Sequence, residues 1–501
     1  MLQCNKLILT WLACVAICCK AGEVGEAPAP ENDVDLYLQI HKPDVGEKIV
    51  VPRLECEDIP GFKPVTMADL PDLQNDFERH CTKCGKINSC GLLCTINYDR
   101  FEERKLEGER KLFISKSLTE FRADIEVRTF WQPGKAPLAV TLLGFGQTAD
   151  DRNARAWQTD LYRAGNHVLS FDSLIRNNMN RAIGHGVAGN IAEEGRLTAR
   201  IINAFLSTPD PEHGGTYRDR ISSVRLLGTS YGGNIALQTL REPSSTLWPL
   251  DRVLVISTPV DFLHTTFLFD KYYREDRSRF GKLSLARLLH GFTPDNDDPS
   301  ERELSLMRAG IGYSFHGDFV SITKDNIERY MPNLKQRLHD FDESSECQNH
   351  RNEQLDLLKS NYEQQKIVLK ERQNQMSKRD FDALKDDFEA RFSNQRDYIK
   401  SRMDDLNHWT FKNYFFLLCR PFWEAKGDDS DFGRLKSLMN GAPNFVQVVI
   451  SEDDPLNHPE DLAELKQALK EPQLLLIPHG GHLGFTGTQW FQALMAKFFA
   501  K

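Results

Sequence analysis

Ser230 is the first residue whose surroundings suggest chemistry. It is the centre of a Gly-x-Ser-x-Gly pattern at residues 228–232, which follows an expected strand at 224–227 and opens an expected helix at 232–240. A serine at such a strand-to-helix turn has a strained backbone that exposes its hydroxyl group, and the glycines let neighbouring segments approach closely. A serine between glycines is also an ordinary turn, so the pattern needs partners elsewhere in the chain.

A nucleophilic serine needs a base that accepts its proton. His482 lies in a His-Gly-Gly-His-Leu-Gly-Phe loop, beyond an expected strand at 473–477 and before an expected helix at 488–499. The glycines allow the loop to curl so that the imidazole reaches the serine. His479 is closer to the strand end and is the competing candidate, and the alternative is that both histidines merely occupy a loop.

The imidazole in turn needs a carboxylate that fixes its tautomer and stabilises the imidazolium. Glu452, Asp453 and Asp454 follow an expected strand at 445–450. We favour Asp454, because Pro455 indicates a fixed turn that aims one carboxylate inward, with Asp453 second and Glu452 third. The chain order serine, aspartate, histidine, with each residue after an expected strand, is much rarer than any one of these patterns.

Backbone N–H groups must meet the negative charge that develops on a substrate oxygen. One candidate donor is the amide of Tyr231, at the positive end of the helix that begins there. The other is the amide of Phe145, in the Leu-Gly-Phe-Gly-Gln segment at 143–147 after an expected strand at 136–143. The glycines of that segment could alternatively serve only a turn between a strand and a helix.

Alternating strands and helices are expected to position these groups. The alternation predicts a parallel sheet covered by helices on both faces, because each parallel crossover must traverse the sheet. It runs through residues 111–258, stops, and resumes over 441–501. The two stretches therefore form one core, and residues 259–440 are an insertion. The expected elements of the first stretch are strands at 111–117, 123–131, 136–143, 167–171, 224–227 and 252–257, and helices at 151–163, 190–206 and 232–240.

The insertion is expected to be mostly helical. One amphipathic face recurs at steps of three and four residues, and no Gly or Pro interrupts residues 348–410. The segment is either one long helix or a hairpin that turns near 375–379. We favour packing on its own domain, with a coiled coil that binds a protein partner at 344–410 as the alternative. The apolar positions of this face are Phe381, Leu384, Phe388, Phe392, Ile399, Met403 and Leu406.

Aromatic side chains gather at both ends of the insertion, at residues 260–273 and 411–423. A cap at this place in the chain would cover Ser230, exclude water and shape a pocket for the substrate. The rings either line that pocket or form ordinary core, and clusters at helical spacing are more often core.

The first 21 residues resemble a signal peptide. An apolar run at 7–19 follows Lys6 and is shorter than a membrane span, and cleavage after Ala21 would leave small residues where a signal peptidase needs them. The protein is thus expected to be exported, either periplasmic or secreted. Membrane association through a lipid on Cys14, Cys18 or Cys19 is one alternative, and an uncleaved apolar terminus is another.

Residues 22–110 form an N-terminal extension with a cysteine cluster. Residues 22–60 are rich in Pro, Glu and Asp and are typical of a linker. Cys81, Cys84, Cys90 and Cys94 lie within fourteen residues and could bind zinc, but the pairs are closer than in most zinc knuckles. Export favours disulfides over zinc, with a connectivity that the spacing does not determine.

The composition of the chain limits the class of protein and the kind of partner. The 501 residues exceed one compact core, and 40% hydrophobic and 27% charged residues are typical of a globular protein. Lys and Arg number 63 against 72 Asp and Glu, a formal charge of -9, which argues against a nucleic-acid partner.

The motifs at 143–147, 228–233, 451–455 and 479–485 together resemble the α/β-hydrolase superfamily. The resemblance implies an α/β fold, with a hydrolase sheet, a large helical cap and Ser230, Asp454 and His482 as the catalytic triad, with Phe145 and Tyr231 in the oxyanion hole. It departs from many members at Leu143, where they have a histidine that orders the loop.

We therefore expect a serine hydrolase, of the carboxylesterase or lipase type, that acts on a small ester or lipid through an acyl-enzyme intermediate without metal or organic cofactor. Thioester or peptide cleavage would use the same residues. The alternative is an exported binding module with an idle triad and a partner for its long polar helix.

Overall fold

The computed structural model describes residues 33–41, 57–72, 108–184, 189–242, 248–274, 331–406, 409–421 and 433–500, together with residues 91, 92, 94, 95, 106 and short stretches of 307–329. The expected signal peptide and lipid sites, and Cys81, Cys84 and Cys90, lie outside the described residues. The chain divides into two compact units, one of Lys42–Lys335 with Asp405–Lys501 and one of Met1–His41 with Gln336–Asp404.

The larger unit is built on one sheet. Eight strands of the described chain lie in the order β1-β2-β4-β3-β5-β6-β7-β8, and all neighbours from β4 to β8 are parallel. Only β1 and β2 at one edge pair antiparallel with their neighbours. The strands are β1 Arg110–Ile114, β2 Ile125–Phe130, β3 Ala136–Leu142, β4 His167–Ser170, β5 Ile221–Thr229, β6 Leu250–Ile256, β7 Val446–Ser451 and β8 Leu474–Ile477.

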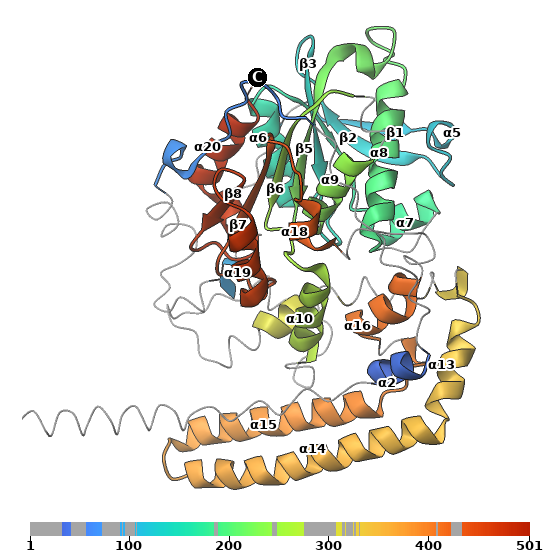
Figure 1. Ribbon diagram of the computed structural model, residues 1–501, viewed down its shortest axis with the longest axis vertical. Helices are drawn as coiled ribbons and strands as arrows, with labels where there is room; N and C mark the ends of the chain where they lie inside the picture. The colour runs from blue at the N-terminus through green and yellow to red at the C-terminus, as the bar shows by residue number, and fades with distance from the viewer. Residues whose placement is uncertain are drawn as a thin grey trace, which may run out of the picture. The chain divides into compact units, whose positions relative to one another are not determined.

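Helices cover both faces of this sheet (Figure 1). α6 (Arg152–Arg163) and α20 (Gln489–Phe498) lie together on one face, and α8 (Ile191–Ser207) and α9 (Tyr231–Arg241) lie on the other. The central strands are accordingly buried along their whole length, as the apolar runs of β3 and β7 require. The other described helices of this unit include α5 Lys116–Thr119, α7 Asn177–Ile183, α10 Phe262–Arg274, α16 Phe411–Tyr414, α18 Leu435–Leu438 and α19 Pro459–Ala468.

Most elements of the core lie where the sequence predicts them. The expected strand at 224–227 is the middle of β5. The expected helix at 151–163 is α6, which starts one residue later, and the expected helix at 190–206 is α8, which is shifted by one residue. β7 joins the sheet beside β6, although about 190 residues separate them in the chain. The two stretches predicted to form one core therefore share one sheet.

The smaller unit contains a helical hairpin. α14 (Ser345–Arg372) and α15 (Lys378–Lys400) are separated by a short turn, so residues 348–400 form a hairpin and not one long helix. The ring of Tyr362 stacks on that of Phe388 and packs at a tilt against that of Phe392, with centroids 4.9 and 4.1 Å away, which places two members of the predicted apolar face inside the hairpin. This unit also contains α2 (Asp33–Ile40) and most of α13 (Leu334–Asp342).

A charged cluster joins three segments of this smaller unit. The Arg351 guanidinium on α14 donates to Asp33 on α2 at 2.6 Å and also to Asp342 on α13. Burial raises the pKa of Asp33, and the adjacent Arg351 opposes that shift. Within the described part of the chain, no helix is both long and apolar enough to cross a membrane.

Candidate active site

Ser230 lies at the turn between β5 and α9. Its φ of 51° and ψ of -129° place a non-glycine residue in a strained conformation, at a cost of about 1–3 kcal/mol. The glycines around it are required by close packing: a Cβ on Gly228 would lie 2.7 Å from the carbonyl oxygen of Gly232, and one on Gly232 would lie 2.1 Å from that of Leu142. The backbones of β5, α9 and the end of β3 pack so closely at this turn that a side chain does not fit at Gly228 or Gly232, and this packing fixes the turn.

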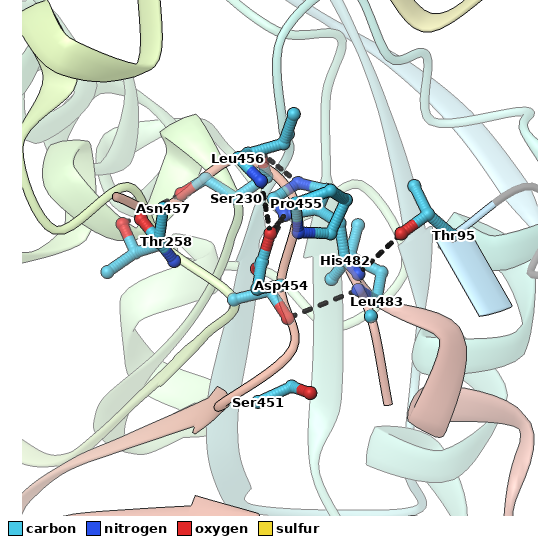
Figure 2. A network of polar contacts seen from close by, with 12 residues as sticks. Thr95, Ser230, Thr258, Ser451, Asp454, Pro455, Leu456, Asn457, His482 and Leu483 are labelled. Carbon is cyan, nitrogen blue, oxygen red and sulfur yellow. Dashed lines mark hydrogen bonds and ion pairs between the residues drawn. The ribbon is translucent and has the colours of Figure 1, made fainter. Parts of the chain in front are cut away.

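Three predicted side chains meet at this turn (Figure 2). His482 Nε2 lies 2.8 Å from Ser230 Oγ, and His482 Nδ1 lies 2.9 and 3.2 Å from the two carboxylate oxygens of Asp454. All three side chains are buried. A neutral imidazole that donates from Nδ1 to the carboxylate presents its Nε2 lone pair to the hydroxyl, which is the arrangement a general base needs.

The structure separates Asp454 from its competitors. Asp454 Oδ1 also accepts from the Leu456 amide at 2.9 Å, so the turn predicted from Pro455 fixes the carboxylate. Glu452 lies on the surface, where its carboxylate pairs with Lys466 Nζ at 2.7 Å.

Asp453 and His479 lie together behind the loop that carries His482. Asp453 Oδ1 accepts from the amides of Gly480 and Gly481 at 2.9 and 2.8 Å, and His479 Nδ1 lies 3.8 Å from Asp453 Oδ2. Burial raises the pKa of Asp453, and the hydrogen bonds from Ser451 and Gly481 oppose that shift. Asp453 therefore holds the backbone of the loop, whereas Asp454 faces the imidazole.

The two predicted oxyanion-hole residues lie next to Ser230. The rings of Phe145 and Tyr231 meet edge to face with centroids 6.0 Å apart, and a Cβ on Gly144 would lie 2.9 Å from Ser230 Cβ. Gln147 fixes this loop, because its Oε1 accepts from the Gly144 amide at 2.8 Å. A buried glutamine thus orders a loop in which Leu143 stands where a histidine was expected from the resemblance.

Residues that the sequence did not single out support the turn from behind. Thr258 Oγ1 donates to the carbonyl oxygen of Ser230 at 2.9 Å, and Asn457 Oδ1 accepts from the amide of Val260 at 2.8 Å (Figure 2). Thr258 follows β6, and Asn457 follows β7. Thr258 ties the loop after β6 to the Ser230 turn, and Asn457 ties the loop after β7 to the loop after β6.

Aromatic side chains of the insertion pack against this corner. The ring of Phe411 lies 6.5 Å from that of Phe145, and the ring of Phe262 lies 4.9 Å from that of Tyr231. Phe262, Phe269, Phe411 and Phe415 are all less than 5% exposed. These four rings are therefore packed core, and Phe262 and Phe411 adjoin the residues beside Ser230. Phe267 and Phe416 are partly exposed, and Phe422 and Trp423 lie outside the described residues.

Three described cysteines and one acidic cluster bear on the predicted disulfides and on metal binding. Among the described residues, Cys94, Cys347 and Cys419 are buried and none forms a disulfide. The predicted disulfides of the cysteine cluster are thus not present at Cys94, and the other three cysteines of the cluster lie outside the described residues. In the acidic cluster of Asp33, Asp342 and Cys347, Arg351 already occupies the carboxylates.

Solved structures that match this chain are hydrolases by name. A lipase in an open form is 12% identical and is matched over 79% of this chain and 100% of its own, with a TM-score of 0.33. An alpha/beta hydrolase enzyme from a Medee basin deep-sea metagenome library is 13% identical over 75% of this chain and 94% of its own, with a TM-score of 0.33. A Pyrobaculum calidifontis esterase is 13% identical over 38% of this chain, with a TM-score of 0.21, and this chain spans about half of it, 54%.

No family model matches the sequence, and no curated protein does. TM-scores this low carry no argument about activity, so the fold is assigned on the chain's own geometry. The sheet is parallel from β4 to β8, Ser230 stands in a strained turn after β5, and Ser230, Asp454 and His482 follow one another in the order that the superfamily uses. The chain therefore has the fold of the α/β-hydrolase superfamily.

Proposed function

We propose that the protein is a serine hydrolase that cleaves carboxylic esters through an acyl-enzyme intermediate. One observation carries the proposal: the buried line of hydrogen bonds from Asp454 through His482 to Ser230, at 2.9 and 2.8 Å. A hydroxyl group becomes an effective nucleophile when an adjacent base takes its proton.

In the first step, Ser230 Oγ attacks the ester carbonyl carbon while its proton passes to His482 Nε2. The carboxylate of Asp454 accepts the hydrogen bond from Nδ1 and stabilises the resulting imidazolium. The amides of Phe145 and Tyr231 are proposed to stabilise the oxyanion, because both residues lie beside Ser230 and Tyr231 begins a helix. His482 then returns the proton to the leaving alcohol, and the acyl group remains on Ser230.

The second step reverses these roles with water. His482 removes a proton from a water molecule that attacks the acyl carbon, and the proton then passes to Ser230 Oγ as the carboxylic acid leaves. The same steps would cleave a thioester or an amide, so the geometry supports a reaction class and leaves the cleaved bond open.

The rings around Ser230 favour an ester with an apolar acyl group. Phe145, Tyr231 and Phe411 form a continuous aromatic corner at the nucleophile. These rings are buried, so they make the surroundings of Ser230 apolar, which suits an aliphatic or aromatic acyl group better than a charged one. A small apolar ester or a lipid is the substrate class that we propose.

A fluorophosphonate probe tests the proposal directly. Wild-type protein is expected to form a covalent adduct at Ser230, located by peptide mass spectrometry, and Ser230→Ala is expected to form none. Ser223→Ala is a matched control, because Ser223 is a buried serine of β5, the strand that precedes Ser230, and its hydroxyl donates to Asp251. Equal labelling of wild type and Ser230→Ala, or no labelling of folded wild type, would contradict the enzyme and support the idle binding module.

p-Nitrophenyl esters of increasing chain length then define the acyl group. We expect kcat/KM to rise with chain length beyond acetate, because each buried methylene contributes about 0.8 kcal/mol.

Export is a further part of the proposal, and it rests on the N-terminal segment with its apolar run at residues 7–19. Cell fractionation of the full chain, with the mature N-terminus sequenced, tests it and separates cleavage after Ala21 from lipidation.

A further inference from the structure

The loop that carries His482 has four consecutive backbone amides, and each donates to a side chain. Gly480 and Gly481 donate to Asp453, His482 donates to Thr95 Oγ1 at 2.8 Å, and Leu483 donates to Ser257 Oγ at 3.2 Å. Asp453 and Ser257 follow β7 and β6. Thr95 instead belongs to the N-terminal extension, 387 positions before the histidine.

Thr95 is oriented for this contact. Its side chain is buried, and its Oγ1 donates to the carbonyl oxygen of Gly91 at 2.6 Å, within a helical segment that also holds Leu92 and Cys94. Since the hydroxyl proton is directed to Gly91, the lone pairs of Oγ1 face the His482 amide. Figure 2 shows this threonine on the side of His482 away from Ser230.

The surfaces of the extension and the loop fit without side chains at three places. A Cβ on Gly481, whose φ is +54°, would lie 2.2 Å from the carbonyl oxygen of Gly91, and one on Gly484 would lie 2.6 Å from that of Cys94. A Cβ on Gly91 would lie 1.9 Å from the carbonyl oxygen of Asp453. Glycines on both sides of the contact allow the two backbones to touch, so the loop is shaped for this neighbour.

We propose that Thr95 is a positioning residue for His482, and that Gly91 and Thr95, which belong to the N-terminal extension, complete the active site from outside the hydrolase core. The inference rests on the proposed function. The amide that Thr95 holds is that of the base itself, so movement of this backbone displaces the imidazole from Ser230 and Asp454 together. A displacement of about 1 Å from productive geometry costs about 100-fold in rate.

Paired substitutions at Thr95 test this. Thr95→Val keeps the shape but removes the acceptor, which leaves the His482 amide buried and unpaired, whereas Thr95→Ser keeps the hydroxyl. An orphaned amide costs about 1–3 kcal/mol, which corresponds to about 5- to 150-fold. We expect Thr95→Val to lower kcat and the rate of fluorophosphonate labelling of Ser230 within that range, to leave KM within about twofold, and Thr95→Ser to recover most of both rates.

Thr239→Val is the matched control, because Thr239 is a buried threonine whose Oγ1 donates within α9 to Ile235 at 2.7 Å. Thr95→Val and Thr239→Val are compared at a temperature where circular dichroism shows both fully folded. Unchanged kcat and labelling in Thr95→Val would overturn the positioning role while wild-type activity kept the proposed function intact. An equal loss of kcat and labelling rate in Thr95→Val and Thr239→Val, or no recovery of these rates in Thr95→Ser, would show that Thr95 has only a structural role and would overturn the proposal. Absence of Ser230-dependent hydrolysis in the wild type would overturn both proposals.

Discussion

The carboxyl group of Glu194 lies beside the phenol group of Tyr231, the residue after Ser230, in the fully buried space between α8 and α9. Glu194 Oε1 accepts from the Gly189 amide at 2.7 Å. Burial raises the pKa of Glu194 to about 8, although the hydrogen bond from the Gly189 amide and the nearby Tyr231 phenol oppose that shift. The carboxyl group is therefore largely protonated at neutral pH, and it lies beside the helix that begins directly after Ser230.

This pair predicts that the protein becomes less stable as the pH rises. The unfolded state loses the Glu194 proton near its ordinary pKa of 4.5, whereas the folded state retains it up to about 8. Between these values the unfolded state binds fewer protons, so the free energy of unfolding falls with pH and levels off above the upper value. Glu194→Gln resembles the protonated form and should remove this part of the decline, with a higher melting temperature than wild type at about pH 9.

Melting curves at several pH values between about 5 and 9 measure this effect. Glu193→Gln is the control, because that neighbouring carboxylate pairs with Arg196 near the surface. If wild type and Glu194→Gln decline in parallel, Glu194 is ionised in the folded protein and its assignment as a buried acid is wrong.

Asp453 and Asp454 are adjacent acids with different tasks, so the same change should affect them differently. Asp454→Asn leaves an amide against His482 Nδ1 and favours the wrong tautomer, which costs about 10⁴-fold in kcat in a triad. Asp453→Asn retains the Oδ1 acceptor for Gly480 and Gly481, so kcat should stay within about tenfold of wild type.

Ester hydrolysis and labelling of Ser230 measure both variants, with circular dichroism as the check of folding. Asp453→Ala, which removes the acceptor, should lose more activity than Asp453→Asn. A larger loss in Asp453→Asn than in Asp454→Asn would mean that the acid of the triad is misassigned.

At Gly232 we expect substitution by alanine to have the opposite of its usual effect in a helix. Inside a helix, Gly→Ala usually stabilises by about 0.5–1 kcal/mol. In Gly232→Ala, however, the new Cβ would lie 2.1 Å from the backbone carbonyl oxygen of Leu142, which must then move together with the Phe145 loop. We expect a lower melting temperature and labelling of Ser230 reduced by about 100-fold.

Gly195→Ala on α8 is the comparison, because its new Cβ would lie 2.6 Å from Cγ of Gln238 and 3.0 Å from the backbone carbonyl carbon of Gln238, which are less close contacts than the one that Gly232→Ala makes. It should cost less than Gly232→Ala in both measurements. Equal labelling rates for Gly232→Ala and wild type would show that the packing of β3 against α9 does not control the site.

The sequence predicted the central site because its residues carry local signals. Ser230, Asp454 and His482 each follow a strand, and glycine or proline stands beside each of them. These signals depend on backbone geometry within a few residues, which is what a sequence pattern records. The strand order of the sheet brings the three residues together once each strand is recognised.

Contacts between residues that are far apart in the chain could not be predicted, because no local sequence pattern records them. Thr95 lies 387 positions from His482, and nothing around it distinguishes it from a threonine in a loop. Gln147 was part of a recognised motif, but its role depends on a side chain that turns back to the Gly144 amide.

The hairpin turn, in contrast, had a local signal in the sequence. The hydroxyl of Ser377 accepts a hydrogen bond from the Asp380 amide, and Ser377 thereby caps the start of α15.

Arg351 provides a last prediction, for the unit that contains the hairpin. Arg351→Met removes the cation paired with Asp33 and the nearer cation of Asp342, which keeps only Arg402 at 3.9 Å, and this loss should destabilise the unit by about 3–5 kcal/mol. Limited proteolysis of the full chain should then cut between residues 345 and 400 much faster, because the hairpin opens more often. Lys359→Met is the control, since Lys359 is an exposed cation of the same helix that pairs with Asp356 at the surface.

Adding Asp342→Asn to Arg351→Met should slow the cleavage again, because one of the two carboxylate charges that lost Arg351 is removed. If Arg351→Met and Lys359→Met are cut at the same rate, the buried cluster does not hold α2 and α13 against the hairpin. Labelling of Ser230, measured on the same samples before proteolysis, separates a local opening of the hairpin from unfolding of the sheet, since only the latter removes the nucleophile from its turn.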